Sequence, residues 1–95
     1  MRIEWDSDKA RRNVAKHGVS LEVAQRVGDD PLHVIIPDRF EDDEEVWHAI
    51  GVVGSVALLV VVHCYPDEDD AERVRIIGAR KATPQERRRY AQEGT

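Results

Sequence analysis

The stretch Val56-Ala57-Leu58-Leu59-Val60-Val61-Val62-His63 decides the fold predicted for this chain. Every residue in it except His63 is apolar, and successive side chains of a strand point to opposite faces of a sheet. A strand over 56–63 must therefore be covered on both faces, as is typical of a central strand. Helices are expected to pack on the sheet that contains it.

Four further strands are expected around this central strand. Residues 32–36 form a largely β-branched run that Pro37 should end, and acidic turns at 38–43 and 66–70 separate the later strands. These short connections favour antiparallel pairing of neighbouring strands. The four strands are predicted at 2–5, 32–36, 46–53 and 73–80.

Two helices are predicted before the sheet. The first, over 7–17, follows an acidic or serine N-cap and stops before Gly18, where a left-handed C-terminal cap is favoured. Ser20 can cap a short second helix that Gly28 ends.

A third helix, over 84–92, has the most specific start signal in the chain. Thr83 and Glu86 form a capping box, and Pro84 occupies the first helical position. The order βααββββα contains no repeat and no low-complexity linker. It predicts a single α+β domain over 1–95, a small, mainly antiparallel sheet packed with three helices.

Composition narrows the class of protein. With 95 residues the chain is long enough for one hydrophobic core. No run approaches the roughly 20 apolar residues of a membrane span, and the N-terminus lacks the apolar run of a secretory signal. Cys64 is the only cysteine, so no intrachain disulfide can form. We expect a cytoplasmic protein that does not contact membranes.

Charge is distributed unevenly along the chain. The formal net charge is −5, yet residues 1–72 hold 7 Lys/Arg and 17 Asp/Glu, whereas residues 73–95 hold 7 Lys/Arg and 2 Asp/Glu. These sums give −10 and +5, so the last quarter of the chain is basic. A local basic region can bind nucleic acid even when the whole protein is acidic. The alternative is that these cations only solvate a strand and a helix.

Short motifs spread over nearly the whole chain carry a family resemblance through their order and spacing. They are Glu4-Trp5-Asp6 through Lys9-Ala10, Lys16-His17-Gly18-Val19-Ser20, Asp30-Pro31, Ile50-Gly51, Arg75 through Thr83, Glu86-Arg87 and Tyr90. In these motifs the chain resembles the BrnT toxins of bacterial type II toxin-antitoxin systems. The resemblance implies a RelE-like fold, cleavage of RNA without a metal, inhibition of translation, and neutralisation by a BrnA-type antitoxin that supplies the DNA-binding part of the complex.

The chain also departs from the family pattern. BrnT toxins usually have Ser at the position of Gly78 and a bulky apolar residue at the position of Gly28, and many RelE-like toxins are basic overall. Gly78 removes a hydroxyl from the motif strand. Reduced toxicity is therefore an expectation for this chain.

Cleavage of RNA without a metal needs cations that stabilise the charged phosphorane, a base for the 2′-OH proton and an acid for the leaving group. Arg80, Lys81 and Arg75 are the predicted cations, because a guanidinium suits phosphate oxygens. Strict alternation places Arg75 and Arg80 on opposite faces of their strand unless Gly78 marks a bulge. Without a bulge, Arg80 is the one we favour. The alternative is that these cations pair with the acidic turns.

Candidate acid-base groups lie on the helices. His17 can act as the base while Lys16 holds phosphate, although both residue types also suit the last turn of a helix without any catalytic role. The Tyr90 hydroxyl can orient a base or donate a proton, unless the ring is simply half-buried packing. Arg87 and Arg88 complete the predicted RNA-binding set.

No metal or other cofactor is expected. His33, His48 and His63 lack a short chelating pattern. His63 and the adjacent Cys64 should point to opposite faces of a strand, which also argues against a shared metal.

Three functions remain open from the sequence. The first is an active ribonuclease toxin, the second a non-catalytic module whose basic C-terminal element binds DNA or an acidic partner, and the third a catalytically weakened toxin that retains antitoxin binding and autoregulation. No helix-turn-helix signature is evident, which weakens a direct DNA role. The basic surface is the expected docking site for the antitoxin, with the acidic strands as the alternative.

Overall fold

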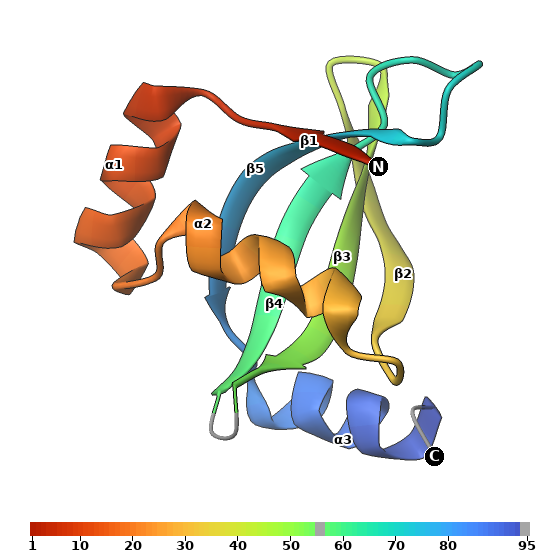
Figure 1. The fold of residues 1–95 in the computed structure, drawn as a ribbon. Helices are drawn as coiled ribbons and strands as arrows, with labels where there is room; N and C mark the ends of the chain where they lie inside the picture. The colour runs from red at the N-terminus through yellow and green to blue at the C-terminus, as the bar shows by residue number, and fades with distance from the viewer. Residues whose placement is uncertain (55–56, 94–95) are drawn as a thin grey trace.

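The chain forms a curved five-stranded sheet with helices on both sides (Figure 1). The computed structural model describes residues 1–54 and 57–93. In chain order its elements are β1 (Arg2–Glu4), α1 (Ser7–His17), α2 (Leu21–Ala24), the 3-10 helix η1 (Gln25–Asp29), β2 (Val34–Glu41), β3 (Glu44–Val53), β4 (Ala57–Cys64), β5 (Arg73–Lys81) and α3 (Pro84–Glu93). The predicted α+β class and the order βααββββα are confirmed, with η1 continuing α2.

The strands lie in the order β1-β5-β4-β3-β2. β4 is central, as its apolar run predicts, and it pairs antiparallel with β3 and β5. Val56, the first residue of that run, lies outside the described residues. The prediction of a mainly antiparallel sheet needs one correction, because β1 pairs with β5 in parallel. Helices rather than a hairpin follow β1 along the chain, so no tight turn imposes the antiparallel direction on it.

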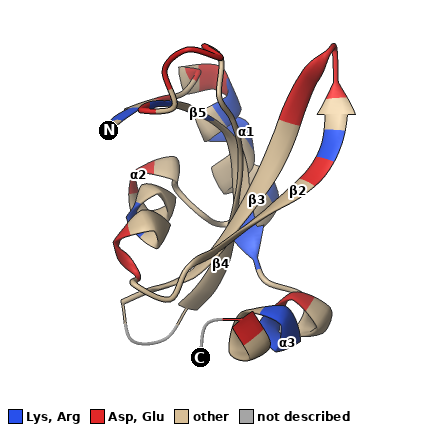
Figure 2. Ribbon diagram, turned by 90° about the vertical axis from the view of Figure 1, so that its right-hand side faces the viewer, with Lys and Arg blue, Asp and Glu red and all other residues tan. Residues whose placement is uncertain are grey.

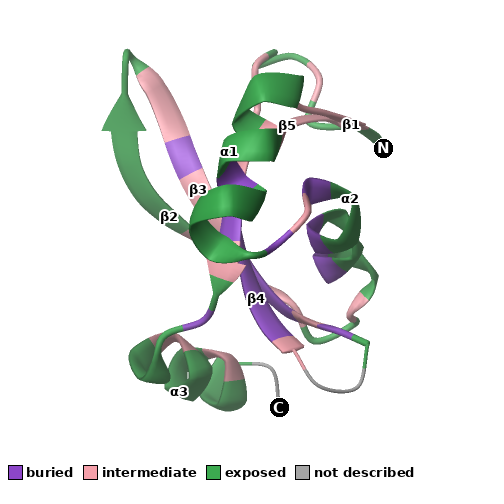
Figure 3. Ribbon diagram, turned by 90° about the vertical axis from the view of Figure 1, so that its left-hand side faces the viewer, coloured by how far each residue is buried: buried purple, intermediate pink, exposed green. Residues whose placement is uncertain are grey.

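The two faces of the sheet are covered unequally. We call the face that packs against α1, α2 and η1 the covered face; it carries the larger apolar cluster, which includes Leu21, Val27 and Val61. The other face, here the open face, meets α3 at one end, where Ile50 and Val60 form a second cluster (Figure 1). Figure 3 shows β4 buried over most of its length between these layers. Beyond α3, no helix within residues 1–54 and 57–93 lies over the open face.

Pro37 does not end its strand, contrary to the sequence prediction. β2 continues to Glu41, with a register shift between Pro37 and Arg39. β2 is an edge strand, and an edge tolerates proline because the missing N–H removes no ladder hydrogen bond there. The acidic turn shrinks to Asp42 and Asp43, which have φ of 51° and 63°. Aspartate is one of the few residue types that enter this left-handed region readily.

The predicted caps at Gly18 and Ser20 are confirmed, whereas Asp6, at the N-cap position of α1, forms no side-chain cap hydrogen bond. Gly18 has a φ of 70°, and its N–H donates to the Val14 carbonyl. The Ser20 hydroxyl accepts from the Val23 N–H at 3.2 Å. The second helical segment extends one residue past the expected stop, because η1 includes Gly28 and ends at Asp29.

The buried side chain of Asn13 attaches α1 to the outer edge of β5. Its Oδ1 accepts from the Ala79 N–H at 3.0 Å, and its Nδ2 donates to the carbonyls of Ala79 and Val19, each at 2.8 Å. β1 pairs with β5 only as far as Arg75, so Asn13 takes up backbone groups that no strand reaches. A Cβ on Gly78 would lie 3.1 Å from the Asn13 Oδ1, which makes a side chain there a tight fit.

Candidate active site

A bulge in β5 brings Arg75 and Arg80 to the same face of the sheet. The register between β4 and β5 shifts after Gly78, so that Ile77 is an extra residue. Alternation then resumes one residue out of phase, and both arginines point to the open face. Of the two possibilities left by the sequence, the structure has the bulge. Both cations therefore lie on the open face, Arg80 toward α3 and Arg75 toward the other end of β5.

Arg80 is held by Glu86 in a two-point ion pair. The Nη1–Oε1 distance is 2.7 Å and the Nη2–Oε2 distance is 2.9 Å. Only 29% of the Arg80 side chain and 16% of the Glu86 side chain are exposed, so solvent weakens the pair less than it would weaken a surface pair. Hydrogen bonds from Arg80 lower the pKa of Glu86 to about 2, and the same contact raises the pKa of Arg80.

Glu86 also closes the capping box of α3. Its Oε1 accepts from the Thr83 N–H at 2.9 Å, and the Glu86 N–H donates to the Thr83 hydroxyl at 3.2 Å. The predicted capping box is confirmed. One carboxylate therefore both starts α3 and neutralises the arginine that the sequence favoured as catalytic.

His48 lies beside this pair, and sequence reasoning did not place it in the site. Its Nδ1 is 3.9 Å from the Glu86 Oε2, and its Nε2 is 3.3 Å from the Asp38 Oδ2. The side chain is 13% exposed. Alternation along β3 put His48 on the same face as Ile50, which was the available signal. Its carboxylate partners come from β2 and α3, two elements that only the folded structure brings to β3.

Arg75 and Arg73 share one carboxylate at the other end of β5. The Arg73 Nε donates to the Glu4 Oε1 at 2.7 Å, and the Arg75 Nε lies 3.5 Å from the Glu4 Oε2. Hydrogen bonding from Arg73, the larger effect, and from Arg75 lowers the pKa of Glu4. Arg75 thus keeps part of its charge uncompensated, because it shares a single carboxylate with a closer arginine.

The Tyr90 hydroxyl is engaged in a contact that ties α3 to the loop before β2. It donates to the Asp30 Oδ2 at 2.6 Å, and the same oxygen accepts from the Val52 N–H at 2.9 Å. The hydrogen bond from Tyr90 is the main cause of the lowered pKa of Asp30. The Tyr90 ring packs on the open-face cluster around Ile50. In this state the hydroxyl is occupied by a structural contact.

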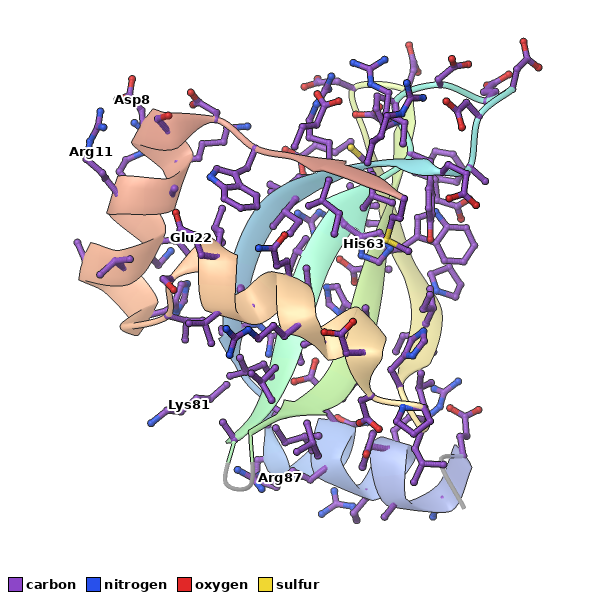
Figure 4. All side chains as sticks on the ribbon, in the orientation of Figure 1. Asp8, Arg11, Glu22, His63, Lys81 and Arg87 are labelled. Carbon is purple, nitrogen blue, oxygen red and sulfur yellow. The ribbon has the colours of Figure 1, made fainter. Side chains whose placement is uncertain are left out.

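The other predicted site residues are spread over α1, the end of β5 and α3. Lys16 and His17 are exposed in the last turn of α1, and Lys81 points to the covered face, since it pairs with Leu59. Arg87 is exposed on α3, and Figure 4 shows Lys81 and Arg87 projecting from the end of the sheet where α3 begins. Arg88, also on α3, is exposed too. The predicted site residues are therefore divided between the two faces of the sheet.

Two further findings concern the described residues alone. Within 1–54 and 57–93, no three His, Cys, Asp or Glu side chains are grouped so as to hold a metal ion. No helix in these ranges is both long and apolar enough to span a membrane.

Comparison with known proteins identifies the family. The model of the family described as the ribonuclease toxin BrnT of type II toxin-antitoxin systems matches residues 5–86. The chain belongs to the BrnT family. A 1.1 Å crystal structure of the Brucella abortus ribonuclease toxin BrnT is similar, with a TM-score of 0.62 and 25% identity, and the match covers 87% of this chain and 97% of that one. No curated protein sequence matches this chain.

Membership in the BrnT family confirms the resemblance read from the sequence motifs. The matched range includes β5 and Glu86, so the open-face site lies within the part of the chain that the family model matches. A toxin of a type II system has an antitoxin partner, and that much follows from the family. The substrate, the mechanism and the kind of antitoxin need a separate argument.

Proposed function

We propose that this BrnT protein is an endoribonuclease that cleaves RNA without a metal, with its active site on the open face around Arg80. The observation that carries the proposal is the common position of Arg80, Arg75 and His48 on that face. It combines phosphate-binding cations with an imidazole, a side chain that can serve as a general base. These are the groups that metal-free cleavage needs.

The reaction that suits these groups is attack by the 2′-oxygen on the adjacent phosphorus. The 2′-OH loses its proton to a base, the new O–P bond forms, and the P–O5′ bond breaks as the 5′-oxygen takes a proton from water. The products are a 2′,3′-cyclic phosphate and a free 5′-hydroxyl. No metal or redox partner enters this balance.

Each residue has a role in this scheme. Arg80 and Arg75 stabilise the phosphorane on the open face of β5. His48 takes the 2′-OH proton, and the Asp38 carboxylate orients its ring. His17, with Lys16 as a phosphate ligand, is the alternative base.

The surrounding residues bind RNA rather than react with it. Lys81, Arg87 and Arg88 guide the strand at the end of the sheet where β5 meets α3. Tyr90 reaches the reacting groups only if its hydroxyl leaves Asp30. In cells, we expect RNA cleavage in the cytoplasm to inhibit translation until a BrnA-type antitoxin binds.

The test is cleavage of a defined RNA by the purified protein in the presence of EDTA. We expect cleavage with a 2′,3′-cyclic phosphate at the new end. Loss of activity on chelation, restored by a divalent metal, would contradict the mechanism.

A catalytically weakened toxin is the second candidate, and one observation favours it. Glu86 already occupies the two-point binding surface of Arg80 that a phosphate would use. An RNA phosphate must displace this carboxylate or bind the guanidinium from another side. Absence of cleavage with retained antitoxin binding would establish this second function.

A further inference from the structure

An acidic groove lies at the end of the sheet opposite α3. Its volume is about 720 Å³, and it runs between the β2–β3 turn and the loop that precedes β5. Figure 2 shows both segments at the same end of the sheet, dense in acidic residues. The carboxylates that line it are Asp42, Asp43, Glu44, Glu45, Asp67 and Glu68.

These carboxylates lack ion-pair partners in the described structure. Among the described residues, none of the six forms an ion pair with a lysine or arginine, and no lysine or arginine lines the groove. The basic last quarter of the chain, residues 73–95, differs because most of its cations have ion-pair partners. Four of its seven cations are paired in the described structure, namely Arg73, Arg75, Arg80 and Arg89. Uncompensated charge is therefore concentrated at the acidic end.

Aromatic rings form the apolar part of the same groove. Phe40 on β2 is 71% exposed, which is unusual for so large an apolar side chain. Trp47 and Tyr65 lie beside it, with their ring centroids 6.2 Å apart in an edge-to-face arrangement. Aromatic faces next to carboxylates suit Lys and Arg side chains, which stack their stems on rings while their charges meet the acids.

An apolar hollow of about 80 Å³ adjoins the groove on the covered face, and Tyr65 lines both. Its wall includes Val27, Val61 and the buried ring of His63, which Figure 4 shows pointing into this region. Ile35, which is 44% exposed, also lines the hollow. Desolvation lowers the pKa of His63, so burial keeps this ring neutral beside the apolar residues. The hollow suits the side chain of one aliphatic residue.

We propose that the acidic groove and its adjoining hollow bind a basic segment of a partner protein, with one apolar side chain in the hollow and Lys or Arg side chains along the carboxylates. A polypeptide fits better than a small cation because the surface requires apolar and cationic groups at once. RNA does not fit, because its phosphates would face six uncompensated carboxylates. The apolar anchor supplies most of the affinity, and the charges set the association rate and register.

This surface is separate from the open-face site around Arg80. The proposal does not depend on RNA cleavage, and an inactive toxin would bind the same segment. An antitoxin whose toxin-binding segment is basic would use this groove instead of the basic surface expected from the sequence.

The test uses three synthetic peptides of equal length, titrated by calorimetry into the full chain. One alternates Arg with Leu, the second alternates Arg with Ser, and the third alternates Glu with Leu. We expect the Arg/Leu peptide to bind at least about tenfold more tightly than the other two, with affinity falling as salt rises. Amide NMR shifts should concentrate on the two acidic loops and around Tyr65.

Variants locate the binding surface. The double variant Glu45→Lys with Glu68→Lys should bind the Arg/Leu peptide at least about tenfold more weakly than the parent chain. The matched control, Glu22→Lys with Asp29→Lys, changes the net charge equally at exposed positions outside the groove and should leave affinity within about twofold. Circular dichroism verifies folding. If the first pair does not fold, Glu68→Lys with Phe40→Ser replaces it, since both residues are exposed.

Four results would overturn the proposal: no binding of the Arg/Leu peptide, equal binding of the Arg/Ser peptide, equal loss in the control pair, or shifts that map to α3. Concentration-dependent self-association of the chain that Phe40→Ser abolishes would also overturn it, because the groove would then be an interface between two copies.

Discussion

The contact between Arg80 and Glu86 belongs both to the fold and to the candidate active site. Their two hydrogen bonds, 2.7 and 2.9 Å long, join the end of β5 to the first turn of α3. The arginine proposed to bind phosphate is therefore fixed by an internal carboxylate. Its position and its availability to RNA are coupled, and variants at either residue report on both.

Glu86→Gln should remove a pH-dependent part of the stability. In the folded protein the pKa of Glu86 is about 2, below its ordinary value of 4.5. A lowered pKa means that the stabilisation, as much as about 3 kcal/mol, is fully present above pH 4.5 and is lost as the pH falls toward 2. Glutamine at this position still caps the helix. Urea melts should show a wild-type advantage that shrinks over this window; an advantage independent of pH would contradict the ion-pair origin.

Arg80→Ala should abolish most RNA cleavage and relieve growth inhibition. Loss of one preorganised cation costs about 10²- to 10³-fold in rate. The same change leaves Glu86 without its partner, so a circular-dichroism melt must show that the variant is folded. Arg80→Lys keeps the charge but loses the two-point contact, and it should recover only a small part of the activity. Full toxicity of folded Arg80→Ala would remove this arginine from the mechanism.

The choice between the two candidate bases can be tested with matched variants. His48→Asn should lower the rate of cleavage about 10²- to 10⁴-fold, as expected for loss of a general base. His17→Asn, on the exposed end of α1, should leave the rate nearly unchanged. The reverse pattern would assign the base to His17 and move the site to the other side of β5.

Tyr90→Phe should loosen α3 without unfolding the domain. The change removes the hydrogen bond to Asp30 but keeps the ring on the open-face cluster. We expect a loss of about 1–2 kcal/mol in the free energy of unfolding and a rise in the pKa of Asp30. NMR titration of the Asp30 carboxyl carbon measures the second effect. Unchanged stability together with lost cleavage would instead indicate a catalytic hydroxyl.

Asn13→Ala should be among the most destabilising single changes. It removes three hydrogen bonds and leaves the Ala79 N–H buried without its partner. A loss of about 2–4 kcal/mol in the free energy of unfolding is expected, measured by chemical denaturation. Leu32→Ala, at a residue 49% exposed, is a control that should cost much less.

Local signals in the sequence were sufficient for most of the fold. The apolar run of β4, the glycine after α1 and the capping box of α3 each depend on neighbours within a few residues, and each is confirmed. The predicted end of β2 at Pro37 was wrong, because the effect of a proline depends on whether its strand lies at the edge of the sheet. That information is contained in the strand order, not in the adjacent residues.

The site was predictable only in part for the same reason. Arg80 and Arg75 were found from residue type and motif, but the bulge at Ile77 decides that they share a face. His48 was considered only as a metal ligand, because its partners Asp38 and Glu86 come from other elements. Pairings between distant elements were the information that the sequence did not supply.

The attachment of Asn13 to Ala79 has a consequence for assembly. β1 and then Asn13 occupy the outer side of β5, so the two edges of the described sheet are β1, which is three residues long, and β2, which is eight residues long. Fibrils grow when every molecule offers two edges, one for each neighbour. Because β1 is so short, only β2 offers a long edge to another chain, which favours a closed two-fold pair over further growth.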